Sequence, residues 1–204
     1  KVILGPEKKS KVYTEKDKKT AAYHEAGHAV VANALPESDP VHKVSIISRG
    51  QAGGYTLKIP DEERSFRTKA QFKAELAVLL GGYTSEQLVL KDISTGASDD
   101  LKRASDLARR LVSKWGMSAK LGPVVFGDTE EMIFLGKEIA EQRNYSEEIA
   151  YTIDQEIAKF VREAQRVAKG VLQKNRGKLE KLAKHLIEKE TIEKKEFEKL
   201  MATA

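Results

Sequence analysis

Two histidines and a glutamate stand at a spacing that supports metal chemistry. His24, Glu25 and His28 form an H-E-x-x-H pattern within the stretch HEAGH. On a helix, residues four apart lie on one face, so both imidazoles can reach a single ion. Glu25 is rotated by about 100° from His24, beside the ion, where its carboxylate can accept a proton from water. The pattern therefore predicts a zinc site in which Glu25 is the general base for peptide-bond hydrolysis.

The residues around this pattern support the same interpretation. Residues 21–35 are almost entirely apolar, so a helix here should turn both histidines toward the interior. A buried carboxylate costs several kcal/mol unless it is paired or lies near a cation, and a metal ion removes that objection. Gly27 costs about 1 kcal/mol relative to Ala inside a helix, which indicates close approach of another segment. A pair of ordinary core histidines is the weaker explanation, because the chain has only four histidines.

A catalytic zinc needs a third protein ligand, and spacing alone leaves several candidates. The other two histidines are His42, in a predicted strand edge, and His185, in a charged C-terminal stretch. A carboxylate is favoured over either, and the candidates are Glu86 and the pair Asp99 and Asp100. Ordinary acidic charge at a helix N-terminus explains that pair equally well. The residues by themselves do not choose among these ligands.

The elements that must position these residues are mainly helices. A helix is predicted from Thr14, which begins a capping box with Asp17, to about residue 35, where Pro36 stops it. Further helices are predicted over 68–90 with an interruption at Gly81 and Gly82, from a cap at Ser98 to Gly116, after Ser146, over 178–189, and after a cap at Thr191. Residues 41–48 and 55–59 are β-branched or alternating and predict paired strands. The expected fold is mainly α with a small β-sheet, a metal-binding helix and a helical C-terminal part.

Composition excludes several classes of protein. The 204 residues are 40% apolar, enough for a core, and contain no cysteine, so disulfides and thiolate metal sites are excluded. A membrane span needs a run of about 18 apolar residues, and the sequence has none. A net charge of +5, spread over the chain, is weak evidence for a nucleic-acid-binding module. A metal-binding scaffold without turnover is the other alternative, although such a site has no use for Glu25.

The chain resembles the FtsH family of membrane-anchored, ATP-dependent zinc metalloproteases over essentially its whole length. The form His-Glu-Ala-Gly-His, combined with Ser-Thr-Gly-Ala, is highly specific for this family. The matching stretches are residues 5–10 (GPEKKS), 23–29 (YHEAGHA), 53–56 (GGYT), 80–82 (LGG), 94–101 (STGASDDL), 115–118 (WGMS), 121–123 (LGP) and 134–136 (FLG).

The resemblance implies a ligand set. It makes Asp100 the third zinc ligand, with His24 and His28, and one Zn²⁺ per chain. It places Glu86 next to the ligands, where its carboxylate is expected to bond the free N–H of a ligating histidine. Tyr83 and Gln87 depart from the residues that are usual in the family, and these departures concern the surroundings of the site and not its zinc ligands or Glu25.

The resemblance also implies a longer protein. Residues 1–13 are expected to be the linker from an N-terminal AAA ATPase module, 14–136 the catalytic part and 137–204 a helical C-terminal part. ATP and Mg²⁺ are expected only in the ATPase module, because the chain has no phosphate-binding loop. The whole protein is expected to be a homo-hexamer anchored in a bacterial inner membrane or an organelle membrane. This soluble part would then face the cytoplasm, matrix or stroma.

The expected substrate is an unfolded polypeptide or a membrane protein, degraded processively and fed by the ATPase module. Such a chain can lie extended along a strand edge by β-addition. This mode of binding recognises an extended backbone more than a particular sequence. The strand beginning with Gly54, Tyr55 and Thr56 is the candidate for that edge. No nucleic-acid partner is expected.

Overall fold

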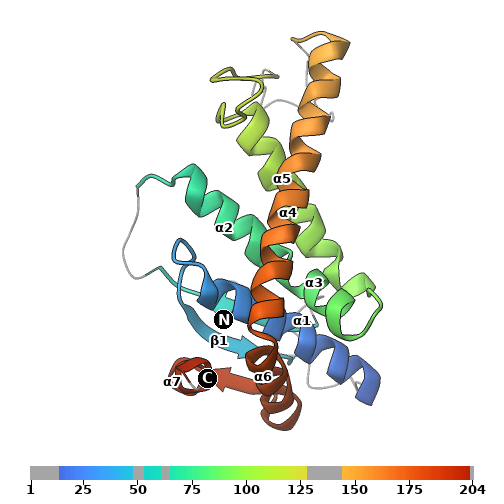
Figure 1. The fold of residues 1–204 in the computed structure, drawn as a ribbon, viewed down its shortest axis with the longest axis vertical. Coiled ribbons are helices and arrows are strands. Elements are labelled where there is room, and N and C mark those ends of the chain that lie inside the picture. Colours follow the sequence, from blue (N-terminus) through green and yellow to red (C-terminus); the bar gives the residue numbers. More distant parts are fainter. Residues whose placement is uncertain (1–13, 48–52, 61–64, 128–143, 203–204) are drawn as a thin grey trace, which may run out of the picture.

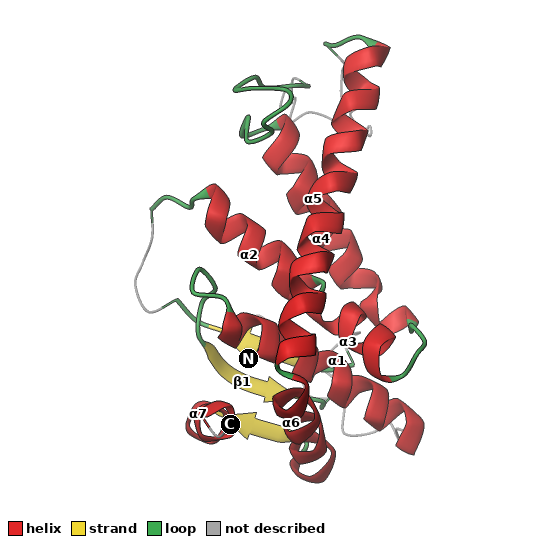
Figure 2. Cartoon of the chain, viewed as in Figure 1, coloured by secondary structure: helices red, strands yellow, loops and turns green. Residues whose placement is uncertain are grey.

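The computed structural model describes residues 14–47, 53–60, 65–127 and 144–202. The described chain is mainly helical with one three-stranded sheet, which confirms the predicted fold class (Figures 1 and 2). In chain order the elements are α1 (Glu15–Ala34), β1 (Val41–Ser45), β2 (Tyr55–Lys58), α2 (Lys69–Leu79), α3 (Gly81–Val89), a 3-10 turn η1 (Thr95–Ala97), α4 (Ser98–Ser113), α5 (Glu147–Lys174), α6 (Arg176–Lys189), β3 (Thr191–Glu193) and α7 (Lys194–Ala202).

Helix α1 has the predicted bounds and lies at the centre of the fold. The Thr14 hydroxyl accepts a hydrogen bond from the backbone N–H of Asp17, and the Asp17 carboxylate accepts one from the Thr14 backbone, so the predicted capping box is confirmed. The chain turns extended at Leu35, directly before Pro36. Helices α2, α3, α5 and α6 all pack against α1. Figure 1 shows the long helix α5, in orange, extending beyond this core beside α4.

Close packing between α1 and α3 depends on two glycines. A Cβ at Gly27 would lie 2.4 Å from the Gly81 carbonyl oxygen, and a Cβ at Gly81 would lie 2.8 Å from the Gly27 oxygen. The two backbones are therefore in direct contact, which confirms the approach that Gly27 predicted. The predicted interruption near Gly81 is also confirmed, because α2 ends at Leu79 and α3 begins at Gly81.

The sheet has the order β2-β1-β3 with both pairs antiparallel. Val44 of β1 is opposite Thr56 of β2 on one side and opposite Ile192 of β3 on the other. The prediction that Thr191 caps the last helix was wrong. Thr191 instead begins β3, and its hydroxyl lies 2.8 Å from that of Ser45. Strand β3 pairs with the edge of β1 that β2 leaves open, a contact that local sequence cannot indicate.

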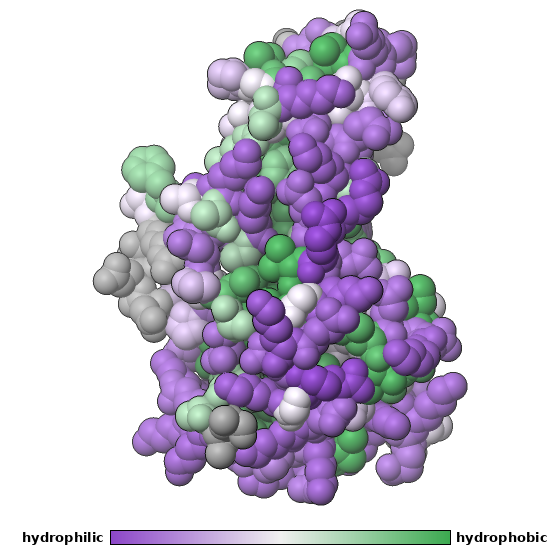
Figure 3. All heavy atoms as spheres, viewed as in Figure 1, coloured by the Kyte–Doolittle hydropathy of each residue, from purple (hydrophilic) through white to green (hydrophobic). Residues whose placement is uncertain are grey.

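Helix α4 differs from its prediction at both ends, because it ends at Ser113, three residues before the predicted stop at Gly116. Ser98 is its first residue instead of its cap, because η1 precedes it and the Ser98 hydroxyl donates to the Thr95 carbonyl. Helix α5 begins as expected after Ser146, whose hydroxyl accepts from the Ile149 backbone N–H. Among the helices of the described ranges, none combines the length and the apolar character that a membrane span needs. Hydrophilic side chains cover most of the face drawn in Figure 3, as the charged helices lead one to expect.

The domain division expected from the sequence falls largely outside the described residues. The linker at residues 1–13 and the boundary after residue 136 both lie there. Within the described chain, α6 packs against α1 and α7 against β1, so elements after the boundary contact elements before it.

Candidate metal centre

Helix α1 carries three ionisable side chains into the interior. His24, Glu25 and His28 are 8%, 6% and 7% exposed, among neighbours that are mostly buried alanine and valine. Buried polar groups of this kind cost free energy unless each finds a partner inside the fold. The contacts of these three side chains therefore show what the site is built to hold.

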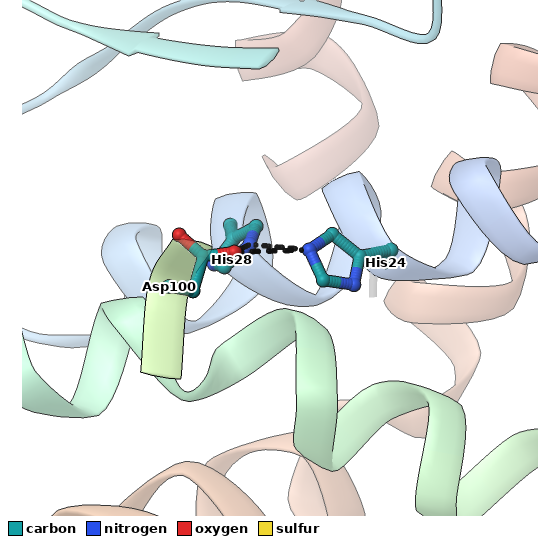
Figure 4. Close-up of side chains that lie close together, drawn as sticks. All are labelled: His24, His28 and Asp100. Atoms are coloured by element: carbon teal, nitrogen blue, oxygen red, sulfur yellow. Dashed lines mark hydrogen bonds and ion pairs between the residues drawn. The ribbon is translucent and has the colours of Figure 1, made fainter. Parts of the chain in front are cut away.

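Asp100, in the first turn of α4, brings a carboxylate to both histidines. Its Oδ2 lies 3.1 Å from Nε2 of His24 and 3.1 Å from Nε2 of His28, and the two Nε2 atoms are 3.0 Å apart. Figure 4 shows the three side chains pointing toward one another, two from α1 and one from α4. Ligands of a tetrahedral zinc with bonds of about 2.0–2.1 Å lie about 3.3 Å apart. The spacing of the three atoms is close to that value.

The other ring nitrogen of each histidine fixes which nitrogen carries the proton. His28 Nδ1 lies 2.7 Å from the Val78 carbonyl oxygen, which can only accept, so Nδ1–H is the donor. His24 Nδ1 lies 2.6 Å from Oε1 of Glu86, whose Oε2 accepts from the Ser94 backbone N–H at 2.7 Å. In the neutral rings both Nε2 lone pairs then face each other and Asp100. Metal-ligating histidines typically donate their other ring N–H to a carboxylate or a backbone carbonyl, and both histidines here have such a partner.

Gly82 leaves the space that such a cation needs. A Cβ at this position would lie 2.5 Å from Nε2 of His24 and 2.6 Å from Nε2 of His28. Any side chain here would therefore occupy the region that the two ligand nitrogens face. The second glycine of the pair that opens α3 thus serves the site, as the first serves the helix contact.

The charge around the cluster also favours a cation. Burial alone would lower the pKa of His24, but hydrogen bonds with Asp100 and then Glu86 outweigh it and raise this pKa to about 10. Burial alone would raise the pKa of Asp100, yet the bonds with the two histidines hold it well below its usual range. Three carboxylates, those of Glu25, Glu86 and Asp100, thus lie around two imidazoles. A divalent cation between the three ligand atoms compensates this charge, so the residues fit zinc.

Glu25 is held by the edge strand and not by the cluster. Its Oε2 accepts a hydrogen bond from the Thr56 hydroxyl at 2.9 Å. A Cβ at Gly54 would lie 2.8 Å from Oε1, so the backbone of the residues before β2 covers the other side of the carboxylate. Burial raises the pKa of Glu25, and the two histidines and Thr56 only partly oppose this effect. A carboxyl with a raised pKa is a better proton acceptor at neutral pH than an exposed one.

The remaining candidates from the sequence lie elsewhere. Asp99 is exposed on the first turn of α4, although it precedes Asp100 directly. His42 is on β1, and His185 is on α6 with its Nδ1 2.9 Å from the Lys181 carbonyl oxygen. Among the described residues, His24, His28 and Asp100 form the group whose ligand atoms lie within 4.8 Å of one another.

Three contacts of this site were not found by sequence reasoning. The acceptor for His28 is the backbone carbonyl of Val78, and the donor to Glu86 is the backbone N–H of Ser94. Nearly every residue has a backbone N–H and a backbone carbonyl, so the residue type gave no sequence signal for either contact. Thr56 was considered only as part of a substrate strand, and its proximity to Glu25 depends on how β2 packs on α1.

Comparisons with known proteins agree with this chemistry. Residues 11–200 match the family described as peptidase family M41. The ATP-dependent zinc metalloprotease FtsH 1 of Thermomicrobium roseum is 54% identical over 199 residues, which cover 98% of this chain and 30% of that protein. FtsH of Caldicellulosiruptor bescii is 53% identical over 201 residues, 98% of this chain and 33% of that protein. FtsH 1 of Sphaerobacter thermophilus is 55% identical over 199 residues, with shares of 98% and 30%. The chain therefore spans about a third of the length of these curated relatives.

Proposed function

The chain belongs to peptidase family M41, its curated relatives are named zinc metalloproteases, and we propose that it is the proteolytic part of a longer FtsH-type protease. In this proposal His24, His28 and Asp100 hold one zinc ion. Zinc, when bound, lowers the pKa of a water ligand to about 7 and polarises the carbonyl of the scissile peptide. The convergence of three ligand atoms within 3.1 Å of one another is the observation that carries the proposal.

The other steps of the proposed reaction are assigned to residues of this chain. Glu25 accepts the proton from the attacking water and passes it to the leaving amine, a role supported by its burial and its raised pKa. Glu86 and the Val78 carbonyl keep the imidazoles of His24 and His28 in the tautomer that leaves Nε2 free for the metal. Asp100 is the anionic ligand of the three, and its charge partly neutralises that of the zinc ion, which the two neutral imidazoles cannot do.

The proposed substrate is an unfolded polypeptide that lies extended along β2. In the sheet order β2-β1-β3, β2 is an outer strand, and Thr56 of this strand contacts Glu25. A chain added to that edge by backbone hydrogen bonds would therefore run beside the general base. Gly54 and Tyr55 are proposed to belong to the same substrate edge. Because the pairing uses backbone groups, it suits substrates of many different sequences.

The remaining parts of the proposal concern the whole protein. The relatives are named ATP-dependent, so we propose an AAA ATPase module, with its own ATP and Mg²⁺, that feeds substrates to this part for processive degradation. We also propose a homo-hexamer, anchored in a bacterial inner membrane or an organelle membrane, with this part on the cytoplasmic, matrix or stromal side. Residues 1–13 would be the linker, 14–136 the catalytic part and 137–204 a helical C-terminal part.

Metal analysis of purified variants tests the ligand set. The chain is purified without added metal, and zinc is measured by plasma mass spectrometry for the wild type, Asp100→Ala and Asp99→Ala. We expect one zinc per chain in the wild type and in Asp99→Ala, which removes an exposed carboxylate one residue away. We expect a large loss in Asp100→Ala. Full zinc in Asp100→Ala would overturn the assignment of the third ligand.

Peptidase assays test the chemistry separately from the metal. Cleavage of an unfolded substrate such as casein should be lost in the presence of a chelator and return on addition of zinc. Glu25→Gln should keep its zinc and lose turnover. A Glu25→Gln variant with normal turnover would show that another group accepts the proton. A wild-type chain that binds zinc without cleaving any unfolded substrate would leave a metal-binding scaffold instead of an enzyme.

A further inference from the structure

We infer that Thr56 is a positioning residue, which ties the Glu25 carboxylate to the edge strand and so sets where the general base stands relative to the substrate. The inference rests on the proposed function, because it deepens the role given there to Glu25. It assigns to the Thr56 hydroxyl a task beyond membership of the substrate strand. The hydrogen bonding of Glu25, the space around its carboxylate and the direction of the Thr56 side chain support this role.

The hydrogen bonding of Glu25 singles out Thr56. The Thr56 hydroxyl lies 2.9 Å from Oε2 of Glu25 and 3.3 Å from its backbone oxygen, so one hydroxyl contacts both ends of the residue. Within the described part of the chain, Thr56 is the residue that donates a side-chain hydrogen bond to this carboxylate. A glutamate side chain has three rotatable bonds and keeps one position only where packing or hydrogen bonds select it. The hydroxyl supplies that selection.

The space around Glu25 limits the other directions in which its carboxylate can move. A Cβ at Gly54 would lie 2.8 Å from Oε1 and 2.9 Å from Cγ, so the backbone there touches the side chain along its length. Gly54 also approaches the Ser45 carbonyl oxygen, at 2.7 Å from the same Cβ position. The carboxylate therefore lies between a backbone wall and the Thr56 hydroxyl, both contributed by the residues that open β2.

The direction of the Thr56 side chain connects the base to the substrate edge. Side chains of a strand alternate between its two faces, so the contact of Thr56 with α1 directs Tyr55 and Leu57 to the opposite face. The outer backbone edge of β2 lies in the plane of the sheet, and among the described strands β2 pairs with β1 alone. One short strand thus presents its edge to the substrate and its hydroxyl to the base. A loss of about 1 Å in such an alignment can cost up to about 100-fold in rate.

Two substitutions separate the hydroxyl from the packing of the side chain. Thr56→Val keeps the branched shape and the strand preference and removes the hydroxyl, whereas Thr56→Ser keeps the hydroxyl and removes the methyl group. Thr84→Val is the matched control. Thr84 is fully buried in α3, and its hydroxyl has no hydrogen-bond partner in the described structure, so its removal breaks no bond.

Each variant of the chain is assayed with a fluorogenic unfolded peptide, and its zinc content and crystal structure are determined. For Thr56→Val we expect kcat to fall about 10-fold, with KM within about twofold and zinc still at one per chain. Its crystal structure should show Glu25 displaced or in several rotamers. Thr56→Ser should recover at least half of the wild-type kcat, and Thr84→Val should match the wild type. If Thr56→Val does not fold, Thr56→Ala tests the same loss.

Several outcomes would overturn the inference. A Thr56→Val variant with wild-type kcat would show that the hydroxyl is dispensable. Equal losses in Thr56→Val and Thr56→Ser would assign the effect to packing, and a raised KM with unchanged kcat would assign Thr56 to substrate binding alone. Failure of the proposed function looks different, because then Glu25→Gln itself retains turnover. An inactive Glu25→Gln together with a fully active Thr56→Val refutes only the role of Thr56.

Discussion

Replacement of Gly82 by alanine should destroy the metal site, while α3, the helix that contains Gly82, remains folded. The new Cβ would lie 2.5 Å and 2.6 Å from the Nε2 atoms of His24 and His28. Ordinary contacts of a Cβ begin at about 3.4 Å, so the two ligand nitrogens must retreat by roughly 1 Å. Loss of a single contact that orients a metal ligand typically lowers metal affinity by about 10- to 100-fold, and a clash with both ligand nitrogens should cost at least as much. With both histidines displaced, we expect zinc affinity to fall at least about 100-fold.

The assay is a zinc titration in competition with a chelator of known affinity, applied to metal-free wild type and Gly82→Ala. Gly170→Ala is the matched control. Gly170 lies inside α5 with nothing within 4 Å of its Cβ position, so the methyl group meets open space. This control should bind zinc normally and gain about 0.5–1 kcal/mol in stability from helix propensity. Far-UV circular dichroism establishes that Gly82→Ala has kept its helices.

The result that refutes this reasoning is wild-type zinc affinity in a folded Gly82→Ala variant. The histidines would then have to ligate from positions roughly 1 Å away from those observed, and the close approach of α3 would not be what shapes the site. A variant that loses its circular dichroism signal would instead show that the contact between α1 and α3 tolerates no displacement at all.

Four further predictions concern stability and the surroundings of the metal. Gly27→Ala should lower the free energy of unfolding by about 1–3 kcal/mol, because its Cβ would lie 2.4 Å from the Gly81 oxygen; urea unfolding measures this, and an unchanged midpoint contradicts it. Lys91→Gly should raise stability by about 0.5–1 kcal/mol, since Lys91 has a φ of 59° that costs a residue with a Cβ about 1–2 kcal/mol; a lower thermal midpoint would argue against it. Glu86→Gln should weaken zinc binding about 10- to 100-fold, because it removes the charged acceptor of His24 Nδ1. Isothermal titration calorimetry measures this affinity, and an unchanged value would show that the contact does not contribute to zinc binding. In the metal-free chain, the raised pKa of His24 should contribute stability that is fully present below pH 6.5 and is lost as pH rises through about 10; unfolding measured across this range in wild type and His24→Gln should differ in slope.

Local sequence was sufficient for the elements whose signals are self-contained. The capping box of Thr14 and Asp17 and the stop at Pro36 predicted α1 to within a residue or two, because helix ends are decided by the side chains that satisfy their backbone groups. The i, i+4 spacing of His24 and His28 placed both imidazoles on one buried face for the same local reason. Gly27 even indicated a close helix contact, although it did not indicate the partner.

The tertiary structure decided what lies opposite these residues. Asp100 is separated from His24 by 76 positions, and nothing in its own stretch distinguishes it from Asp99 until α4 is packed against α2 and α5. The Val78 carbonyl, the Ser94 N–H and the Thr56 hydroxyl reach the site in the same way, through the packing of α2, η1 and β2. Strand β3 was mistaken for a helix cap because its three residues become a strand only beside the open edge of β1. Sequence periodicity determines which face an element buries, whereas the residue it meets depends on free-energy contributions summed over the whole core.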